Sequence, residues 1–324
     1  MMKTLLRSLT LLLVIGPTFS AVPGAIASER IGGTSGAFSR LGFGARGMGM
    51  GNALTAVVHG DVSGYYNPAV IPFAGYRFIS ASFGILSLDR SLNFLGYSQP
   101  LAPRAGISVG IINSGISDID GRDSDGEPTG PLRTSENQVF LTFGIHFQSA
   151  FSLGITLKYY HNHLYTDVTS TSVGVDLGVL VHIVDGFTAG ATVRDINSEY
   201  QWDTGKIYGR DGSKTFAPFP KLYTLGLAYQ FQDSVALVAG DVELSSVKTL
   251  FARFGVEVPL VKEFTLRSGI DRIDLKESGS GVRPSFGFTV RPQLGDWTPA
   301  IIYSYVVEPF SPSGMHIIAV SLRL

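Results

Sequence analysis

The sequence contains no cysteine among its 324 residues. This absence excludes a disulfide framework, a thiolate metal site, a cysteine nucleophile and a lipid anchor on cysteine. Charged residues are also scarce, at 16%, and the formal net charge is −1, so no basic surplus is available to hold a phosphate backbone. We therefore expect no nucleic-acid partner.

The chain begins with a segment that reads as a targeting signal. Lys3 and Arg7 form a positive n-region, Leu9–Ile15 an apolar core, and Ala25–Ala27 an A-x-A cleavage site. We assign residues 1–27 to a signal peptide and expect the mature chain to start directly after it. A retained signal anchor is the alternative, but glycine and proline interrupt the apolar run too early to span a bilayer.

From residue 76 onward no stretch reads as a transmembrane helix, and apolar residues instead alternate with small or polar ones. In 151–159 the odd positions are Phe, Leu, Ile, Leu and Tyr, and the even positions are Ser, Gly, Thr and Lys. Alternate side chains of a strand point to opposite faces, so one face suits lipid and the other water. The same pattern recurs at 138–147, 172–181, 223–231 and 316–324.

Glycine, proline, aspartate and asparagine clusters divide this region into fourteen expected strands. The two longest connections, 114–134 and 198–218, both follow odd-numbered strands, and the connections after even-numbered strands are tight, as in outer-membrane barrels. The strands are expected at 76–86, 90–100, 104–113, 135–148, 151–165, 169–183, 186–197, 219–232, 234–246, 248–258, 262–275, 281–291, 297–307 and 313–324.

The predicted fold class is therefore an all-β transmembrane antiparallel barrel over residues 76–324, located in a bacterial outer membrane. A soluble β-sandwich also alternates and is the alternative. A sandwich does not need fourteen amphipathic strands, however, whereas a barrel in lipid turns its apolar face outward and pairs every strand by closing. Outer-membrane lipid and lipopolysaccharide are its expected surroundings.

Residues 28–75 form a separate segment, with ten glycines at 31–72 and no sustained alternation. The glycines at 42, 44 and 47 match the dinucleotide fingerprint G-x-G-x-x-G, but no buried strand precedes them and no βαβ unit follows. We therefore expect no nucleotide and no other cofactor. The glycines are better explained by backbone passing close to backbone in a confined space.

This segment resembles a known family. The run GFGARGMGMGNALTAV at 42–57, then Asp61 and YYNPAV at 65–70, is similar to the N-terminal signature of PorV/PorQ-like outer-membrane proteins, relatives of the FadL fatty-acid channels. The resemblance departs from the usual pattern at Asn52 and at 58–60. It implies a fourteen-stranded barrel with an N-terminal hatch in the lumen, whose motif residues are Gly42, Gly44, Ala45, Arg46, Gly47, Gly49, Gly51, Asp61, Asn67, Pro68 and Ala69.

The residues themselves suggest structural roles at this motif. Arg46 inside a lumen needs a carboxylate or carbonyl partner, and Asn67 before Pro68 favours a turn that redirects the chain into the first strand. On the inward faces of later strands we expect lumen-lining polar residues that form cross-strand ion pairs or select a passing solute. These are Lys158, Asp176, Arg194, Arg253, Glu257, Arg267, Asp271 and Arg323.

Two further clusters carry side chains that can bind metal ions. The acidic run at 118–127 carries oxygen ligands of the kind that calcium prefers, but its spacing does not fit an EF-hand, and a solvated outer loop explains it better. His161 and His163 share a strand face without a third ligand. No G-x-S-x-G motif marks a nucleophile, so we predict neither a metal site nor an enzyme.

Two functions remain open. The PorV-like resemblance implies a secretion-associated barrel that works with a translocon and receives exported proteins, with 114–134 and 198–218 as contact loops. The FadL-like resemblance implies a channel for hydrophobic small molecules such as fatty acids, with a pocket between hatch and wall. The motif favours the first.

Overall fold

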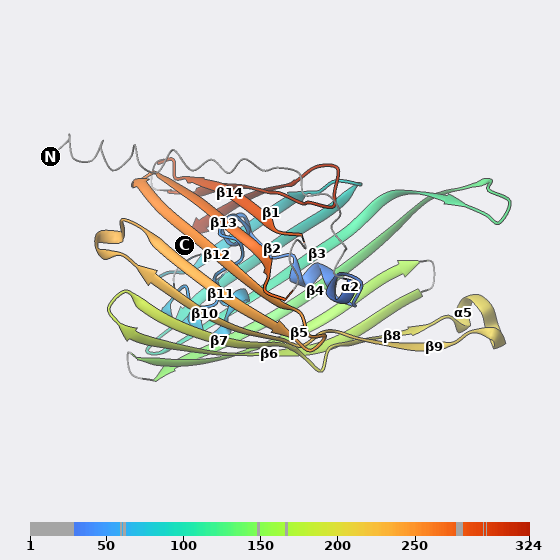
Figure 1. The fold of residues 1–324 in the computed structure, drawn as a ribbon, viewed down its shortest axis with the longest axis horizontal. Coiled ribbons are helices and arrows are strands. Elements are labelled where there is room, and N and C mark those ends of the chain that lie inside the picture. The colour runs from blue at the N-terminus through green and yellow to red at the C-terminus, as the bar shows by residue number, and fades with distance from the viewer. Residues whose placement is uncertain are drawn as a thin grey trace.

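The computed structural model describes residues 29–58, 60, 63–147, 150–165, 168–276, 281–293, 295 and 297–324. The predicted signal peptide and Asp61 lie outside these residues. Fourteen antiparallel strands form a closed barrel (Figure 1), which confirms the predicted fold class. The barrel strands are β1 Phe78–Ile85, β2 Arg90–Leu101, β3 Ala105–Arg122, β4 Pro128–Phe147, β5 Phe151–Tyr165, β6 Val168–Val184, β7 Phe187–Ile196, β10 Leu222–Gln230, β11 Leu237–Ser245, β12 Leu250–Val261, β13 Phe264–Asp274, β14 Arg283–Val290, β15 Ala300–Val306 and β16 Met315–Arg323.

Each barrel strand pairs with the next one along the chain, and β1 closes the barrel by pairing with β16. Phe78 lies opposite Arg323, so the first and last barrel strands are in register from end to end. This closure gives every strand two neighbours, which removes the free edges that an open sheet would expose to lipid. Among the described residues no helix is long and apolar enough to cross a membrane.

The barrel is apolar outside and polar inside. On β5 the side chains of Leu153, Ile155 and Leu157 are exposed, whereas Ser152 and Thr156 on the opposite face are buried. A water-soluble protein has the reverse arrangement, so the outward belt is explained by contact with hydrocarbon. The closed fold and this belt place the chain in an outer membrane.

The turns distinguish the two ends of the barrel. At one end lie the tight connections, such as the two-residue turn Asp185–Gly186 between β6 and β7, where Gly186 takes a φ of +73°. Two long hairpins project from the other end (Figure 1). Outer-membrane barrels have short periplasmic turns and long outer loops, so we call the ends inner and outer accordingly.

The predicted loops at 114–134 and 198–218 are corrected by the structure. β3 and β4 continue through the first as one long hairpin, and the second folds into β8 (Glu199–Asp203) and β9 (Lys214–Pro218), joined by α5 (Gly205–Tyr208) and η3 (Gly209–Asp211). These hairpins extend beyond the membrane belt, so both of their faces meet water. They therefore lack the apolar alternation on which the strand assignment depended.

The N-terminal segment lies inside the barrel, where it appears in blue (Figure 1). Its elements are short helical turns, which suits a sequence rich in glycine and poor in periodic apolar residues. They are α2 Glu29–Gly32, η1 Ala37–Arg40, α3 Ala45–Gly49, α4 Ser63–Tyr66 and η2 Pro68–Phe73, and η4 (Gln232–Ser234) forms part of the β10–β11 turn. We call residues 29–75 the hatch.

A charge on the outer belt should destabilise the barrel. Leu157 lies near the middle of the outward face of β5, so Leu157→Arg should lower the free energy of unfolding by about 2–4 kcal/mol. Leu88→Arg, in the β1–β2 turn, is the control and should cost about 0–1 kcal/mol. Urea titration of barrels refolded into vesicles measures both, and equal losses would contradict the assignment of the belt.

Candidate functional site

The hatch runs through the lumen from the outer end to the inner end. Near its start, Ile31 packs against Leu222 and Phe251, which lie where β10 and β12 begin at the outer end. At its other end, η2 leads into β1 at the inner end. The candidate functional site is therefore the interior of the barrel, in which the hatch decides what space remains.

The hatch backbone lies directly against glycines of the wall. At eight inward positions, a Cβ added to the glycine would stand less than 3.0 Å from hatch atoms, closer than real Cβ atoms approach their neighbours. Any larger residue there would push the hatch away. We call this set the glycine belt: Gly106, Gly144, Gly154, Gly178, Gly190, Gly226, Gly255 and Gly269.

The glycine belt is built by strand register. Gly144 lies opposite both Gly106 and Gly154, and Gly154 lies opposite Gly178, so four neighbouring strands present glycine side by side. Against this surface lies the hatch segment Asn67–Ile71. On the other side of the lumen a second glycine pair, on β12 and β13, receives Met50 and Gly51.

Buried ion pairs hold the hatch on the β12–β13 side. Arg46 Nε donates to Glu257 Oε2 at 2.8 Å, and Arg267 Nε donates to the same oxygen at 2.6 Å. Arg267 Nη1 also donates to Thr289 Oγ1 at 2.6 Å. Glu257 therefore joins a hatch arginine to the wall across 211 residues of sequence.

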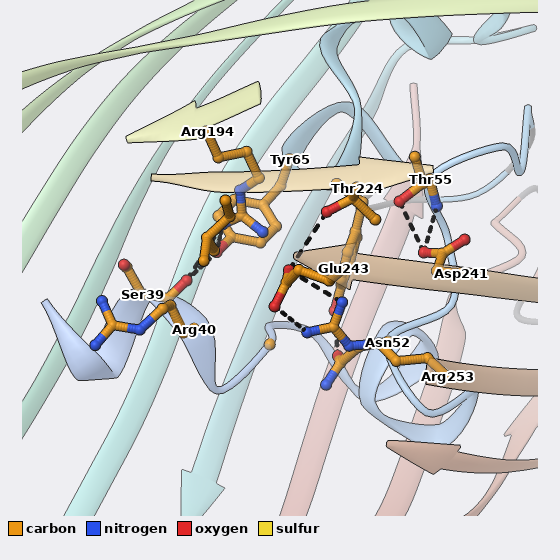
Figure 2. A pocket seen from close by; sticks show the side chains of 13 residues that line it. Ser39, Arg40, Asn52, Thr55, Tyr65, Arg194, Thr224, Asp241, Glu243 and Arg253 are labelled. Carbon is orange, nitrogen blue, oxygen red and sulfur yellow. Dashed lines mark hydrogen bonds and ion pairs between the residues drawn. The ribbon is translucent and has the colours of Figure 1, made fainter. Parts of the chain in front are cut away.

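A second network lies next to it, and Figure 2 shows its central part. Asn52 Nδ2 donates to Asp271 Oδ2 at 3.0 Å, and Asp271 Oδ1 accepts from Arg253 Nε at 2.7 Å. Arg253 then forms a two-pronged ion pair with Glu243, at 2.8 and 3.0 Å. Such forked arginine–carboxylate pairs fix geometry as well as charge.

The loop after α3 is also tied to the wall. Thr55 donates both its backbone N–H, at 3.2 Å, and its hydroxyl, at 2.7 Å, to Asp241 Oδ2 on β11 (Figure 2). Asn67 N-caps η2 by accepting from Ala69 N at 2.9 Å, and its Nδ2 donates to Thr55 O at 2.7 Å and Val179 O at 3.1 Å.

A third network lies on β5, β6 and β7. Lys158 Nζ lies 2.6 Å from Asp176 Oδ2 and 3.0 Å from Asp195 Oδ1, and Tyr160 donates its hydroxyl to Asp195 Oδ1 at 2.6 Å. Arg194 stacks its guanidinium over the ring of Tyr65, 4.7 Å from the centroid (Figure 2). Arg194 therefore connects this wall cluster to the hatch helix α4.

The described residues line cavities at three places along the lumen. An outer cavity of about 360 Å³, which we call the vestibule, lies between the hatch turn at residues 31–41 and the outer ends of β2, β3, β4, β13 and β14. A central polar space of about 20 Å³ adjoins Asn52, Thr55 and Arg194, and an inner cavity of about 220 Å³ lies beside Val57. A space of about 10–15 Å³ holds one water, so this central space is too small for an organic solute.

The structure places the predicted motif residues at the tightest points of the hatch. Gly42 (φ +95°) lies against the side chain of Asn52, and Gly44 precedes α3, where Ala45 accepts a hydrogen bond from Ser304. The remaining motif residues make similar close contacts. Gly47 faces Tyr66, Gly49 faces Ser304, Gly51 (φ +60°) lies on the backbone of β12 and β13, and Pro68 and Ala69 lie on the glycine belt.

The predicted lumen residues divide into two groups. Seven lie in the three networks, six of them buried and Glu257 half-buried: Lys158, Asp176, Arg194, Arg253, Glu257, Arg267 and Asp271. Arg323 differs, because it is exposed at the inner mouth and lies over the ring of Tyr76, 4.1 Å from the centroid.

Alternation alone misses several residues of the site. Asp195 and Arg272 follow inward residues and should face lipid, but each has a positive φ at a β-bulge that turns it inward. Asp241 and Glu243 were detectable, since both lie on the inward face of β11. Tyr65 and Thr55 lie within the motif at 42–57 and 65–70, but no local pattern predicted their contacts, because these join the hatch to distant strands.

The acidic run at 118–127 forms the tip of the β3–β4 hairpin. Asp123 Oδ1 accepts from the backbone N–H of Asp125 and of Glu127, both at 2.9 Å, and Arg122 pairs with Asp120 at 2.7 Å. Within the part of the chain that the structure describes, no group of three or more histidine or acidic residues could hold a metal ion.

Comparisons with known proteins bear on the fold. The toluene transporter TodX of Pseudomonas putida aligns over 87% of this chain and 96% of its own, with a TM-score of 0.62 and 14% identity. CymD, a monoaromatic hydrocarbon channel, aligns over 87% of this chain and 96% of its own, with a TM-score of 0.61 and 13% identity. A Pseudomonas aeruginosa FadL homologue aligns over 86% of this chain and 97% of its own, with a TM-score of 0.58 and 12% identity. The chain has the fold of these FadL-type outer-membrane channels. No protein-family model and no curated protein matches it.

These comparisons support one of the two resemblances drawn from the hatch motif and not the other. The likeness to FadL-type barrels is confirmed at the level of fold, and the three proteins above are channels or their homologues rather than enzymes. Nothing in the comparisons supports membership of the PorV/PorQ family or a part in secretion. The comparisons therefore do not support the preference for a secretion role that the motif gives.

Removing the carboxylate shared by hatch and wall should loosen the hatch. In Glu257→Gln, Arg46 and Arg267 lose their common anionic partner in a buried site, with an expected cost of about 3–5 kcal/mol. Chemical unfolding in detergent measures this loss. Asp120→Asn is the control, because its pair with Arg122 is exposed and should contribute at most about 1 kcal/mol. Similar losses in the two variants would contradict the assignment.

A methyl group on the glycine belt should displace the hatch. Gly269→Ala places a Cβ against the backbone of Met50 and Gly51, so we expect a loss of about 1–3 kcal/mol and faster proteolysis of the hatch. Gly240→Ala is the matched control, since its Cβ would lie against wall atoms, the ring of Phe254 at 3.2 Å and Arg253 O at 3.6 Å, rather than against the hatch. Equal protease resistance in both variants would show that the belt does not seat the hatch.

Proposed function

We propose that this protein is an outer-membrane channel for hydrophobic small molecules. The observation that carries the proposal is the vestibule: a cavity at the outer end of a plugged barrel, lined on one side by apolar hatch residues including Ile31, Phe38 and Leu41. Its volume of about 360 Å³ lies within the range of small-molecule sites. TodX is a toluene transporter and CymD a monoaromatic hydrocarbon channel, and aromatic hydrocarbons are a compatible solute class.

A solute in the vestibule needs an exit, and the wall offers a weak point. The β6–β7 pairing ends where Val175 lies opposite Ile196. Beyond this pair, β6 contacts β8 through side chains. The hydroxyls of Ser172 and Ser170 on β6 accept hydrogen bonds from the backbone N–H groups of Glu199 and Gln201 on β8, at 2.8 and 2.9 Å. We call this line of contact the seam. Opening it breaks few bonds, whereas moving the hatch breaks the Arg46–Glu257 ion pair and several buried hydrogen bonds to the wall.

Aromatic side chains connect the vestibule to the seam. Phe38 lies edge-on to Tyr160 with ring centroids 6.2 Å apart, and Phe219 follows at 4.9 Å from Tyr160. Tyr200 and Trp202 of β8 continue the series at 4.8 and 5.4 Å. An apolar solute moving along these rings avoids the charged networks at the centre, where desolvated charges disfavour it.

Because the chain has no native cysteine, paired cysteines can lock the seam or the hatch. A Cβ on Gly174 would lie 3.4 Å from that of Ser198 at the seam, and a Cβ on Gly49 would lie 3.4 Å from that of Ser304 between hatch and wall. Both separations are close to those of disulfides.

We expect vesicles containing the protein to take up toluene faster than empty vesicles. Oxidised Gly174→Cys/Ser198→Cys should lose most of this gain and recover it on reduction, while oxidised Gly49→Cys/Ser304→Cys should keep it. Loss of the uptake gain only in the hatch-locked protein would indicate that the solute passes where the hatch moves, and not through the seam. No gain over empty vesicles for the wild-type protein would overturn the proposed function.

A secretion role is the second candidate, and the observation that favours it is the outer hairpin pair. At the β8–β9 end Ile207, Tyr208 and Phe216 are exposed, as a protein-contact surface would require. Shortening the β3–β4 hairpin to a tight turn should then abolish capture of exported proteins without changing toluene uptake. Unchanged secretion in such a strain would count against this candidate.

A further inference from the structure

A groove lies on the outside of the barrel, on the lipid-facing side of β1–β4, and has a volume of about 430 Å³. Gly96 and Gly110, which lie opposite each other on β2 and β3, are part of its lining. Its walls are outward apolar side chains: Ile79, Leu95, Tyr97, Val109, Ile111 and Val139. A groove among apolar side chains offers an acyl chain more contact than a flat surface does.

A row of three asparagines borders this groove on the side of the outer end. Asn93, Asn113 and Asn137 lie opposite one another on β2, β3 and β4, each two residues beyond an apolar groove residue of the same strand. Asn93 Nδ2 donates to Asn113 Oδ1 at 3.4 Å, and Asn113 Nδ2 donates to Asn137 Oδ1 at 2.8 Å. An amide has two N–H donors, so among the described residues each asparagine keeps at least one unused hydrogen. Amides beside hydrocarbon are costly without partners, so the row favours a ligand with acceptors at this depth.

The outward face of β4 becomes more polar toward the outer end. After Asn137, this face continues with Ser135 and Arg133. Arg133 is exposed and pairs with no carboxylate among the described residues. His161 and His163 of β5 lie opposite Asn137 and Ser135 and add ring nitrogens to the same surface. We call these residues and the asparagine row the polar face.

The length of the polar face restricts the ligand. Arg133 lies four residues from Asn137, which is about 13 Å along the strand. A single phosphodiester head group beside the asparagines does not reach that far. A phosphorylated disaccharide does, and it carries hydroxyl and amide groups between its ends. Guanidinium groups bind phosphate through paired, charge-assisted hydrogen bonds.

We propose that the groove and the polar face bind lipopolysaccharide of the outer leaflet. One acyl chain of its lipid A anchor lies in the groove, the sugars lie on the asparagines and histidines, and a phosphate lies on Arg133. Two features carry this assignment. The positive charge of Arg133 complements the phosphate, and the order from apolar groove to amides to arginine along β4 matches the order of acyl chain, sugar and phosphate. The site lies outside the lumen, so it does not depend on the proposed channel function.

Binding of lipid A to the protein in detergent, washed free of bound lipid, tests the inference by native mass spectrometry. We expect a one-to-one complex with diphosphoryl lipid A that is at least about tenfold tighter than the complex with phosphatidylethanolamine, because only lipid A reaches Arg133. Equal affinity for the two lipids would overturn the proposal. A protein dimer that forms without binding lipid A would assign the groove to a second copy of the chain and would overturn it as well.

A variant of the arginine tests the head-group contact. Arg133→Gln should weaken binding of diphosphoryl lipid A by about tenfold and leave dephosphorylated lipid A unchanged, because only the phosphate pairs with the guanidinium. Arg210→Gln is the matched control, since Arg210 is also exposed but lies in η3 of the other outer hairpin. Equal affinities of the two variants, with the fold intact by thermal unfolding, would refute the assignment of the phosphate.

A second variant tests the acyl-chain contact. Ile111→Trp fills the groove with a larger apolar side chain, so it should weaken both forms of lipid A severalfold. Leu227→Trp is its control, because Leu227 is exposed on the lipid-facing side of β10, away from the groove. Unchanged binding in Ile111→Trp would show that no acyl chain occupies the groove and would overturn the proposal.

Discussion

Direct contact between hatch backbone and wall backbone is the constraint on which the rest of the structure depends. A barrel of fourteen strands encloses more space than its own inward side chains fill, and here glycines on neighbouring strands leave room for a second layer of main chain. This demand explains the eight wall glycines that lie against the hatch. The hatch is thus part of the wall packing, and a Cβ on either surface would separate the two.

Networks of ion pairs add to the glycine contacts in holding the interior of the barrel together. Because the inward faces are sealed from water by the hatch, their charged groups must pair with one another, and they do so in three networks that each join strands or connect strand to hatch. Removing one partner from such a network costs more than its formation contributed. The same networks exclude an apolar solute from the centre, which is why the proposed route leaves the vestibule sideways along the aromatic rings.

The sequence predicts the barrel well because lipid imposes a simple rule. β5 is observed at Phe151–Tyr165, the predicted bounds, since apolar and polar residues alternate through the whole strand. Prediction fails where that rule lapses: at 114–134 both faces meet water, and at Asp195 and Arg272 a bulge reverses the expected face. The site was harder still, because pairs such as Arg46 with Glu257 depend on where the hatch lies rather than on any local pattern.

The account as a whole claims that the resting barrel is sealed by the hatch. Conductance of the wild-type protein in a planar lipid bilayer tests this most directly, since ions report any continuous aqueous path. The account predicts no steady conductance above that of the bare membrane, because the central space of about 20 Å³ admits about one water. A stable ohmic conductance of the size shown by open porins would contradict it.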